Sequence, residues 1–274
     1  MPGPLRLPDQ DILFMVRTLM PHRTDHVRVV EAIRDDRAYL EAMLDDERLF
    51  QQVMGDDEIL VKISPRLFFH ILLRRALRDL RELTHTVEVR NLQKVAVFDA
   101  DQVVDLLEKP EVREYLADML ASFTRIESVT VPVRVRRGVW RKVRFSDFDL
   151  DSLERYAQSV EEELRFGPYK RIADVCLFLV GMFPEYIEAQ YRYPLSRAPR
   201  RGLLGRRPRS LEEYEEEGRQ FYSLAAEHEA AHALNLRDVL STLAERFTLA
   251  EKPLAHLAQR YLHLSRQRLF GLEG

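Results

Sequence analysis

The sequence predicts a mainly α protein, a multi-helix globular bundle with a small inserted antiparallel β-sheet. Helical apolar spacing recurs in most segments of the 274-residue chain. After Arg171, an apolar run extends to Phe183 and is interrupted only by Asp174. This run predicts a central helix covered by protein on all sides, since it is too short to cross a bilayer. Two β-rich segments, near 86–98 and 128–145, predict hairpins.

Composition narrows the class of protein. A hydrophobic fraction of 46% and a charged fraction of 32% are typical of a soluble globular chain. The net charge of -3 gives no general attraction to nucleic acid or to anionic membranes, so such binding must come from local patches. The single cysteine, Cys176, excludes an internal disulfide and is predicted to be a buried thiol. With an N-terminus that lacks the apolar core of a signal peptide, this favours a reducing cytoplasm.

The first part of the chain predicts short helices and then a long one. Ser64 and Pro65 are typical of a helix start, and that helix is expected to run to Leu83. Its arginine-rich side is interpreted as a solvated face. Aspartate pairs at the ends of the short helices are interpreted as helix caps. The short helices are expected at 11–20, 25–34, 37–44 and 47–54, the aspartate pairs lie at 35–36, 45–46 and 56–57, and the arginines are Arg74, Arg75, Arg78 and Arg81.

The second hairpin is the clearer of the two. Strands are expected at 128–135 and 139–145, joined by a three-residue loop that ends in glycine. The predicted register places Val135 opposite Val139 and makes one face almost wholly apolar. The other face combines positive charge with an aromatic ring, as phosphate contact plus base stacking requires. The candidate residues for nucleic-acid or polyanion binding are Arg134, Arg136, Arg137, Trp140, Lys142 and Arg144.

An alternative interpretation of this basic face is purely structural. Charge on an edge hairpin also prevents edge-to-edge aggregation. Arginine is the default basic residue here, because only six of the 42 basic residues are lysines. An arginine cluster is therefore weaker evidence of function than it is in other chains.

Three regions are expected. Residues 1–193 form a helical core with an α+β insertion at 85–146, 194–210 form a mobile arginine-rich linker, and the helices of 211–274 pack on the core. The linker contains six arginines and no acidic residue. Within the core, Asp174 must find a partner because it is a lone carboxylate among apolar neighbours, and an arginine is the expected partner.

The sequence His228-Glu229-Ala230-Ala231-His232 matches the HExxH pattern of zinc hydrolases. Histidines four residues apart lie on one helix face and can both bind zinc, while the glutamate polarises the zinc-bound water. A single helix is expected over 211–233, with His228 and His232 as metal ligands and Glu229 as the catalytic base. No cofactor is expected otherwise; zinc is the one that this motif would bind.

Two observations argue against this zinc site. No third ligand is securely placed, although Asp238 is a candidate. No strand is expected beside this helix, whereas such peptidases use a sheet edge to align their substrate. The alternative is a pair of histidines in a helix–helix seam.

Three hypotheses about function follow. The first is a non-catalytic cytoplasmic binding protein that engages nucleic acid or an acidic protein partner through the hairpin and the linker. The second is a zinc-dependent hydrolase or peptidase that uses the HExxH helix, and the third is a structural protein–protein adaptor. No membrane partner is expected, and the sequence leaves oligomerisation open. Phosphate loops, dinucleotide fingerprints and nucleophile triads are not visible.

Overall fold

The fold comes from a computed structural model, which describes residues 7–90, 92–124, 128–136, 139–146, 149–192, 209–262 and 269–270. In this part of the chain, fifteen α-helices and two two-stranded antiparallel sheets confirm the predicted fold class. None of the helices described there combines the length and apolar character needed to span a bilayer.

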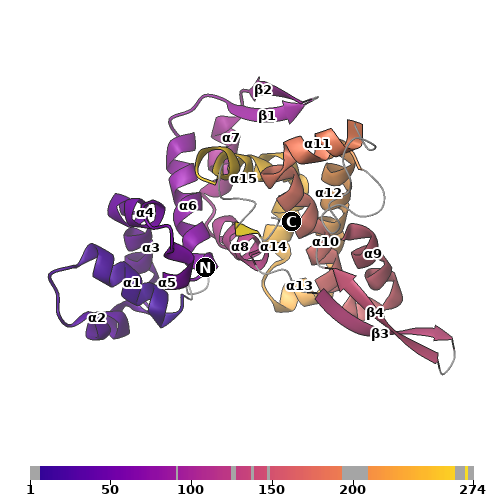
Figure 1. The fold of residues 1–274 in the computed structure, drawn as a ribbon, viewed down its shortest axis with the longest axis horizontal. Coiled ribbons are helices and arrows are strands. Elements are labelled where there is room, and N and C mark those ends of the chain that lie inside the picture. The colour runs from indigo at the N-terminus through magenta and orange to yellow at the C-terminus, as the bar shows by residue number, and fades with distance from the viewer. Residues whose placement is uncertain are drawn as a thin grey trace.

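The N-terminal helices form one side of the molecule (Figure 1). Aspartates begin two of them as predicted, because the Asp36 carboxylate accepts from the Tyr39 N–H and the Asp46 carboxylate accepts from the Arg48 N–H. The long helix α6 follows and is capped by the Ser64 hydroxyl. These helices are α1 (Asp9–Leu19), α2 (His26–Ile33), α3 (Arg37–Leu44), α4 (Glu47–Met54), α5 (Ile59–Lys62) and α6 (Pro65–Leu80).

The central helix is α10, and the prediction that it is covered on all sides is confirmed. Every residue from Ile172 to Met182 is buried, including the Cys176 thiol. Helices α12 and α15 pack against it. The remaining helices are α7 (Ala100–Leu107), α8 (Pro110–Ser122), α9 (Leu150–Ser159), α10 (Phe166–Met182), α11 (Pro184–Arg192), α12 (Leu211–Glu227), α13 (Glu229–Ala233), α14 (Arg237–Glu245) and α15 (Phe247–Arg260), with a 3-10 turn at Glu162–Leu164.

Two glycines allow these helices to approach closely. A Cβ atom on Gly218 of α12 would lie 2.3 Å from a ring carbon of Phe247, and one on Gly181 of α10 would lie 2.6 Å from the Leu254 Cβ. Both distances are far below van der Waals contact. The sequence positions of these glycines thus set the spacing between α15 and the two helices beside it.

The first hairpin consists of β1 (Thr86–Arg90) and β2 (Gln93–Val97), paired from Thr86 opposite Val97 to Arg90 opposite Gln93. Strand β2 thus begins three positions after the last residue of β1. Ion pairs hold β1 on the helices: Arg90 contacts Glu215 of α12 at 3.0 Å, and Lys252 of α15 contacts Glu88 at 2.7 Å.

Candidate functional site

The second hairpin has the predicted pairing over most of its length. Strands β3 (Ser128–Arg136) and β4 (Val139–Ser146) pair with Val129 opposite Phe145 and Val131 opposite Val143. The prediction for the tip is wrong, because a register shift between Arg134 and Arg136 places Arg136, rather than Val135, opposite Val139. A β-bulge inserts one extra residue on one strand and alters the ladder in this way.

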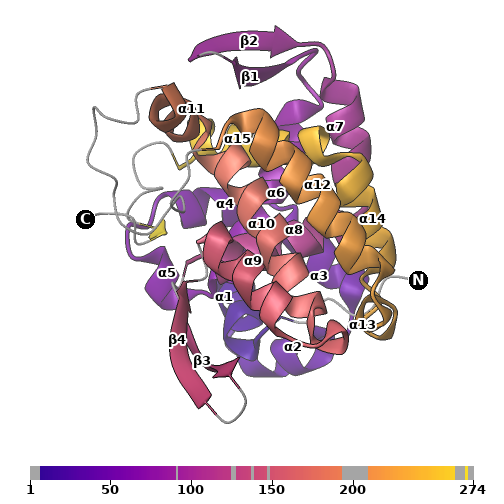
Figure 2. The same cartoon turned by 90° about the vertical axis from the view of Figure 1, so that its right-hand side faces the viewer.

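The register brings together several of the candidate polyanion-binding residues. Arg134 is paired with Trp140, and Lys142 is paired with Pro132. Arg144 lies two positions further along β4, opposite Thr130. Arg137 lies outside the described residues, as do residues 194–208 of the predicted linker. Figures 1 and 2 show that the hairpin extends away from the helices, beside α9.

The HExxH segment does not form one continuous helix, and this prediction is wrong. Helix α12 ends at Glu227, and His228 has an extended backbone with φ -69° and ψ 141°. The His228 side chain instead caps the short helix α13, because its Nδ1 accepts from the Ala230 N–H at 3.1 Å. His232 is exposed rather than part of a buried seam. The break places the two histidines at the start and the end of a separate five-residue helix.

Neither histidine offers an unoccupied lone pair to a metal ion. His228 uses Nδ1 as the acceptor for its cap, so its Nε2 donates to the Glu162 carbonyl at 2.9 Å. The Nε2 of His232 accepts from the Arg237 guanidinium at 3.0 Å. Over the described residues no group of three or more possible ligands, Asp238 included, could hold a metal ion. The residues at 228–232 therefore do not fit a zinc site, and we derive no hydrolase chemistry from them.

Asp174 is buried and paired, as predicted, but its partner is a lysine rather than an arginine. Lys170, one helical turn earlier, contacts its Oδ2 at 2.6 Å. Its Oδ1 accepts from the Tyr115 hydroxyl at 2.6 Å and from the Tyr222 hydroxyl at 2.9 Å. The carboxylate therefore ties α8 and α12 to the central helix. All these contacts are internal, so we assign Asp174 a structural role.

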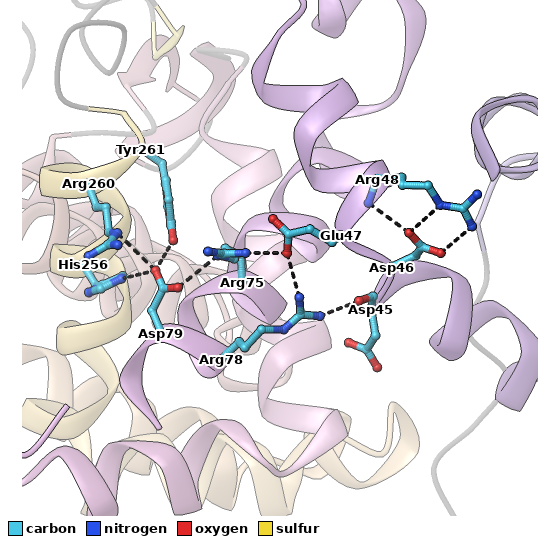
Figure 3. Close-up of polar contacts among 10 residues, drawn as sticks. All are labelled: Asp45, Asp46, Glu47, Arg48, Arg75, Arg78, Asp79, His256, Arg260 and Tyr261. Carbon is cyan, nitrogen blue, oxygen red and sulfur yellow. Dashed lines mark hydrogen bonds and ion pairs between the residues drawn. The ribbon is translucent and has the colours of Figure 1, made fainter. Parts of the chain in front are cut away.

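The arginine face of α6 is solvated as predicted at Arg81, which is about half exposed, but its other arginines form an ion-pair network with neighbouring elements (Figure 3). Arg74, which is buried, contacts Asp45 at 2.9 Å. Arg75 and Arg78 both contact Glu47 of α4. Three of the four arginines, Arg74, Arg75 and Arg78, are therefore paired with carboxylates of the same chain.

This network leads to Asp79 on the last turn of α6, whose side chain is only 8% exposed. Its Oδ2 accepts from the Tyr261 hydroxyl and from His256 Nε2 at 3.2 Å, and Arg260 Nε lies 3.2 Å away. Its Oδ1 accepts from Arg75 at 3.0 Å. Burial by itself raises the pKa of Asp79, but the donors outweigh it and lower the pKa below its usual value.

A second charge cluster surrounds Arg209, at the end of the predicted linker. This guanidinium contacts three carboxylates: Asp151 at 2.9 Å, Glu154 at 2.9 Å and Glu217 at 3.0 Å. It lies in an open groove of about 700 Å³ between α9 and α12. Burial and the neighbouring Glu154 carboxyl raise the pKa of Glu217 to about 8.

Sequence analysis did not find either of these clusters. Asp79 and His256 are 177 positions apart, and Arg209 is 55 positions from Glu154. Single residues of these types are common in the chain, so no local motif marks them. In comparisons with protein families, curated proteins and solved structures, no significant match to this chain was found.

Proposed function

We propose that this protein is a non-catalytic binding protein that contacts single-stranded nucleic acid through the β3–β4 hairpin. The observation that carries the proposal is the concentration of charge. Residues 128–146 contain six basic residues and no acidic residue, in a chain whose net charge is -3. The rest of the chain consequently carries a net negative charge, so polyanion binding is favoured at the hairpin and, by sequence, at the arginine-rich segment 194–210.

Single strands are favoured over duplexes because of Trp140. It is paired with Arg134 and precedes Lys142 by two positions on the same strand. A single strand presents both phosphates and unstacked bases, so it can use an aromatic ring and basic groups at once. A cytoplasmic location is part of this proposal, and the buried thiol of Cys176 agrees with it.

The test exploits the fact that Trp140 is the only tryptophan in the chain. We expect a mixed-sequence single-stranded oligonucleotide to quench its fluorescence through base stacking. Heparin, a polyanion without bases, should bind without the same quenching. If heparin quenches equally, the site recognises charge alone rather than nucleic acid.

The charge contribution is tested with the triple variant Arg134→Ala, Lys142→Ala and Arg144→Ala. We expect it to weaken oligonucleotide binding at least tenfold and to reduce the slope of log affinity against log salt by about 2. The matched control removes three exposed basic residues elsewhere, Arg17, Arg28 and Lys94, and should change neither quantity. Equal losses in both triple variants would show that the hairpin is not the binding site.

A further inference from the structure

A cleft of about 360 Å³ opens between the end of α6, strand β1 and the C-terminal part of α15. We call it the His256 cleft. Its volume lies in the range of small-molecule sites. The residues that matter for the argument are Leu80, Leu83, His85, His256, Gln259 and Arg260.

The charge of this lining distinguishes it from the groove at Arg209. Among the described residues that line the His256 cleft, none carries a carboxyl group, whereas four glutamates line the groove. Asp79 lies behind the wall of the cleft, and its charge is balanced by the donors already described. The carbonyls of Asp79 and Leu80 accept from the N–H groups of Glu82 and Leu83, which weakens the negative potential of the α6 terminus.

Arg260 supplies the charge that faces solvent. Its Nε lies 3.2 Å from Asp79, which orients the guanidinium, yet its side chain remains 58% exposed. In the described part of the chain no protein group is seen to bind its two Nη groups. A planar guanidinium with two such groups matches the geometry of a carboxylate.

His256 lies one helical turn before Arg260 and also lines the cleft. Because its Nε2 donates to the Asp79 carboxylate, Nδ1 is the nitrogen that remains for a ligand. Burial lowers the pKa of His256 despite the favourable contact with Asp79. At neutral pH the imidazole is therefore neutral in the free protein, and an anion in the cleft would favour its protonated form.

One side of the cleft is apolar. Leu80 of α6 and Leu83 just after it line that side, and Leu83 is partly exposed to solvent. A ligand that occupies both sides must therefore be amphipathic. Burial of a few methylene groups there strengthens binding.

We propose that the His256 cleft binds a small organic carboxylate with a short apolar tail. The carboxylate lies against Arg260, with His85 and Gln259 beside it, and the tail lies on Leu80 and Leu83. Binding is accompanied by uptake of a proton at His256, which is then placed between Asp79 and the ligand. This site is independent of the proposed nucleic-acid contact.

The first experiment titrates the protein with hexanoate and hexylammonium, which share a tail and differ in charge. The side-chain Hε1 signals of the histidines are followed by NMR, and the His256 signal is assigned from the spectrum of His256→Gln. We expect hexanoate to shift the His256 signal saturably and hexylammonium to leave it unchanged. Equal binding of the cation would overturn the assignment to an anion.

The next measurements separate the contributions of the tail and of the head group to the affinity. Acetate and inorganic phosphate should bind at least tenfold more weakly than hexanoate, because neither uses the apolar wall. The variant Leu83→Ala should weaken hexanoate binding and leave acetate binding unchanged. If phosphate binds as tightly as hexanoate, the cleft recognises oxyanions generally, and the proposed carboxylate class is wrong.

Arg260→Gln tests the head-group contact, and we expect it to weaken hexanoate binding at least tenfold. Asp79 keeps three other donors in this variant, so the protein should remain folded, which thermal unfolding checks. Arg246→Gln is the matched control, since this exposed arginine lies at the opposite end of α15. Unchanged affinity in Arg260→Gln would exclude the proposed site.

Proton uptake at His256 provides a further test, because it would not accompany hexanoate binding if His256 only stabilised the fold. The titratable groups around His256 are Asp79 of α6 and Arg260 of α15, the Tyr261 ring packed against it, and Lys252 and His85, which line the same cleft. Saturating hexanoate should raise the pH at which the His256 signal titrates, and hexanoate affinity should fall as pH rises. An unshifted titration at saturation would contradict the placement of the carboxylate beside His256.

Discussion

Asp79 and Glu217 are both largely buried carboxyl groups that contact arginine, yet their pKa values move in opposite directions. Asp79 is surrounded by two arginines, a histidine and a tyrosine, and its pKa falls below its usual value. Glu217 shares one arginine with two other carboxylates, and its pKa rises to about 8. Burial raises the pKa at both sites; the donors around Asp79 outweigh it, whereas the single arginine beside Glu217 does not.

The two sites consequently have different roles in the molecule. At Asp79 the ionised carboxylate joins α6 to the end of α15 and, through Arg75, to α4 (Figure 3). At Glu217 a proton relieves the repulsion among carboxylates on α9 and α12. The Asp79 carboxylate therefore stabilises the fold at neutral pH. At Glu217, by contrast, the protein loses stability when the carboxyl group loses its proton.

The largest expected effect comes from Asp79→Ala. Removal of this carboxylate leaves His256 and Tyr261 without their acceptor and Arg75 with only Glu47, so we expect a loss of about 3 to 5 kcal/mol in the free energy of unfolding. Urea denaturation at neutral pH measures it. A loss no larger than that of Glu47→Ala, which removes a more exposed carboxylate of the same network, would contradict the stabilising role of Asp79.

A somewhat smaller effect is expected from the pH dependence of Glu217. Its pKa in the folded state, about 8, lies above the usual value of 4.5, so the folded protein binds more protons between these values. Stability should therefore fall as pH rises from about 5 to about 8, by roughly 2 to 4 kcal/mol. In Glu217→Gln this fall should be absent, as denaturation at several pH values would reveal.

The sign is opposite for Asp79. Because its pKa is lowered, its contribution is present above the usual value of 3.8 and is lost as pH falls through the lowered pKa. Asp79→Asn should thus flatten the acid limb of the stability curve, whereas Glu217→Gln flattens the neutral limb. Finding both changes in the same pH range would show that the two sites do not differ as we describe.

The smallest effect is expected for an ion pair outside both clusters. Arg81 contacts Glu108 at 2.8 Å, and both side chains are about half exposed. Arg81→Ala should change the free energy of unfolding by less than about 0.5 kcal/mol, because solvent screens such pairs. A loss comparable to that of Asp79→Ala would mean that exposure does not separate the arginines of this helix.

Local sequence signals predicted most of the fold. The apolar run around Cys176 identified the central helix, and Ser64 with Pro65 identified the start of α6. Alternation of apolar residues fixed the pairing of β3 with β4, apart from the bulge between Arg134 and Arg136. These features depend on neighbours within a few positions, so the chain itself carries the information.

The candidate sites were less predictable. His228 and His232 have the spacing of zinc ligands, but that spacing is meaningful only in a continuous helix, and the His228 side chain ends α12 by capping α13. The sequence predicts a solvated arginine face on α6 because the carboxylate partners are distant in the chain: Asp45 lies just after α3, and Glu47 lies on α4. Long-range packing decided both outcomes.

By itself, the sequence determined the helical class, the buried central helix, the two hairpins and the concentration of basic residues at 128–146. Only the tertiary structure decided which charges are paired. Asp79 meets His256, and Arg209 meets Glu217, through helices that come together for apolar burial. Ion pairing depends on distances of a few ångströms between residues far apart in the chain, and a linear pattern of residue types does not contain those distances.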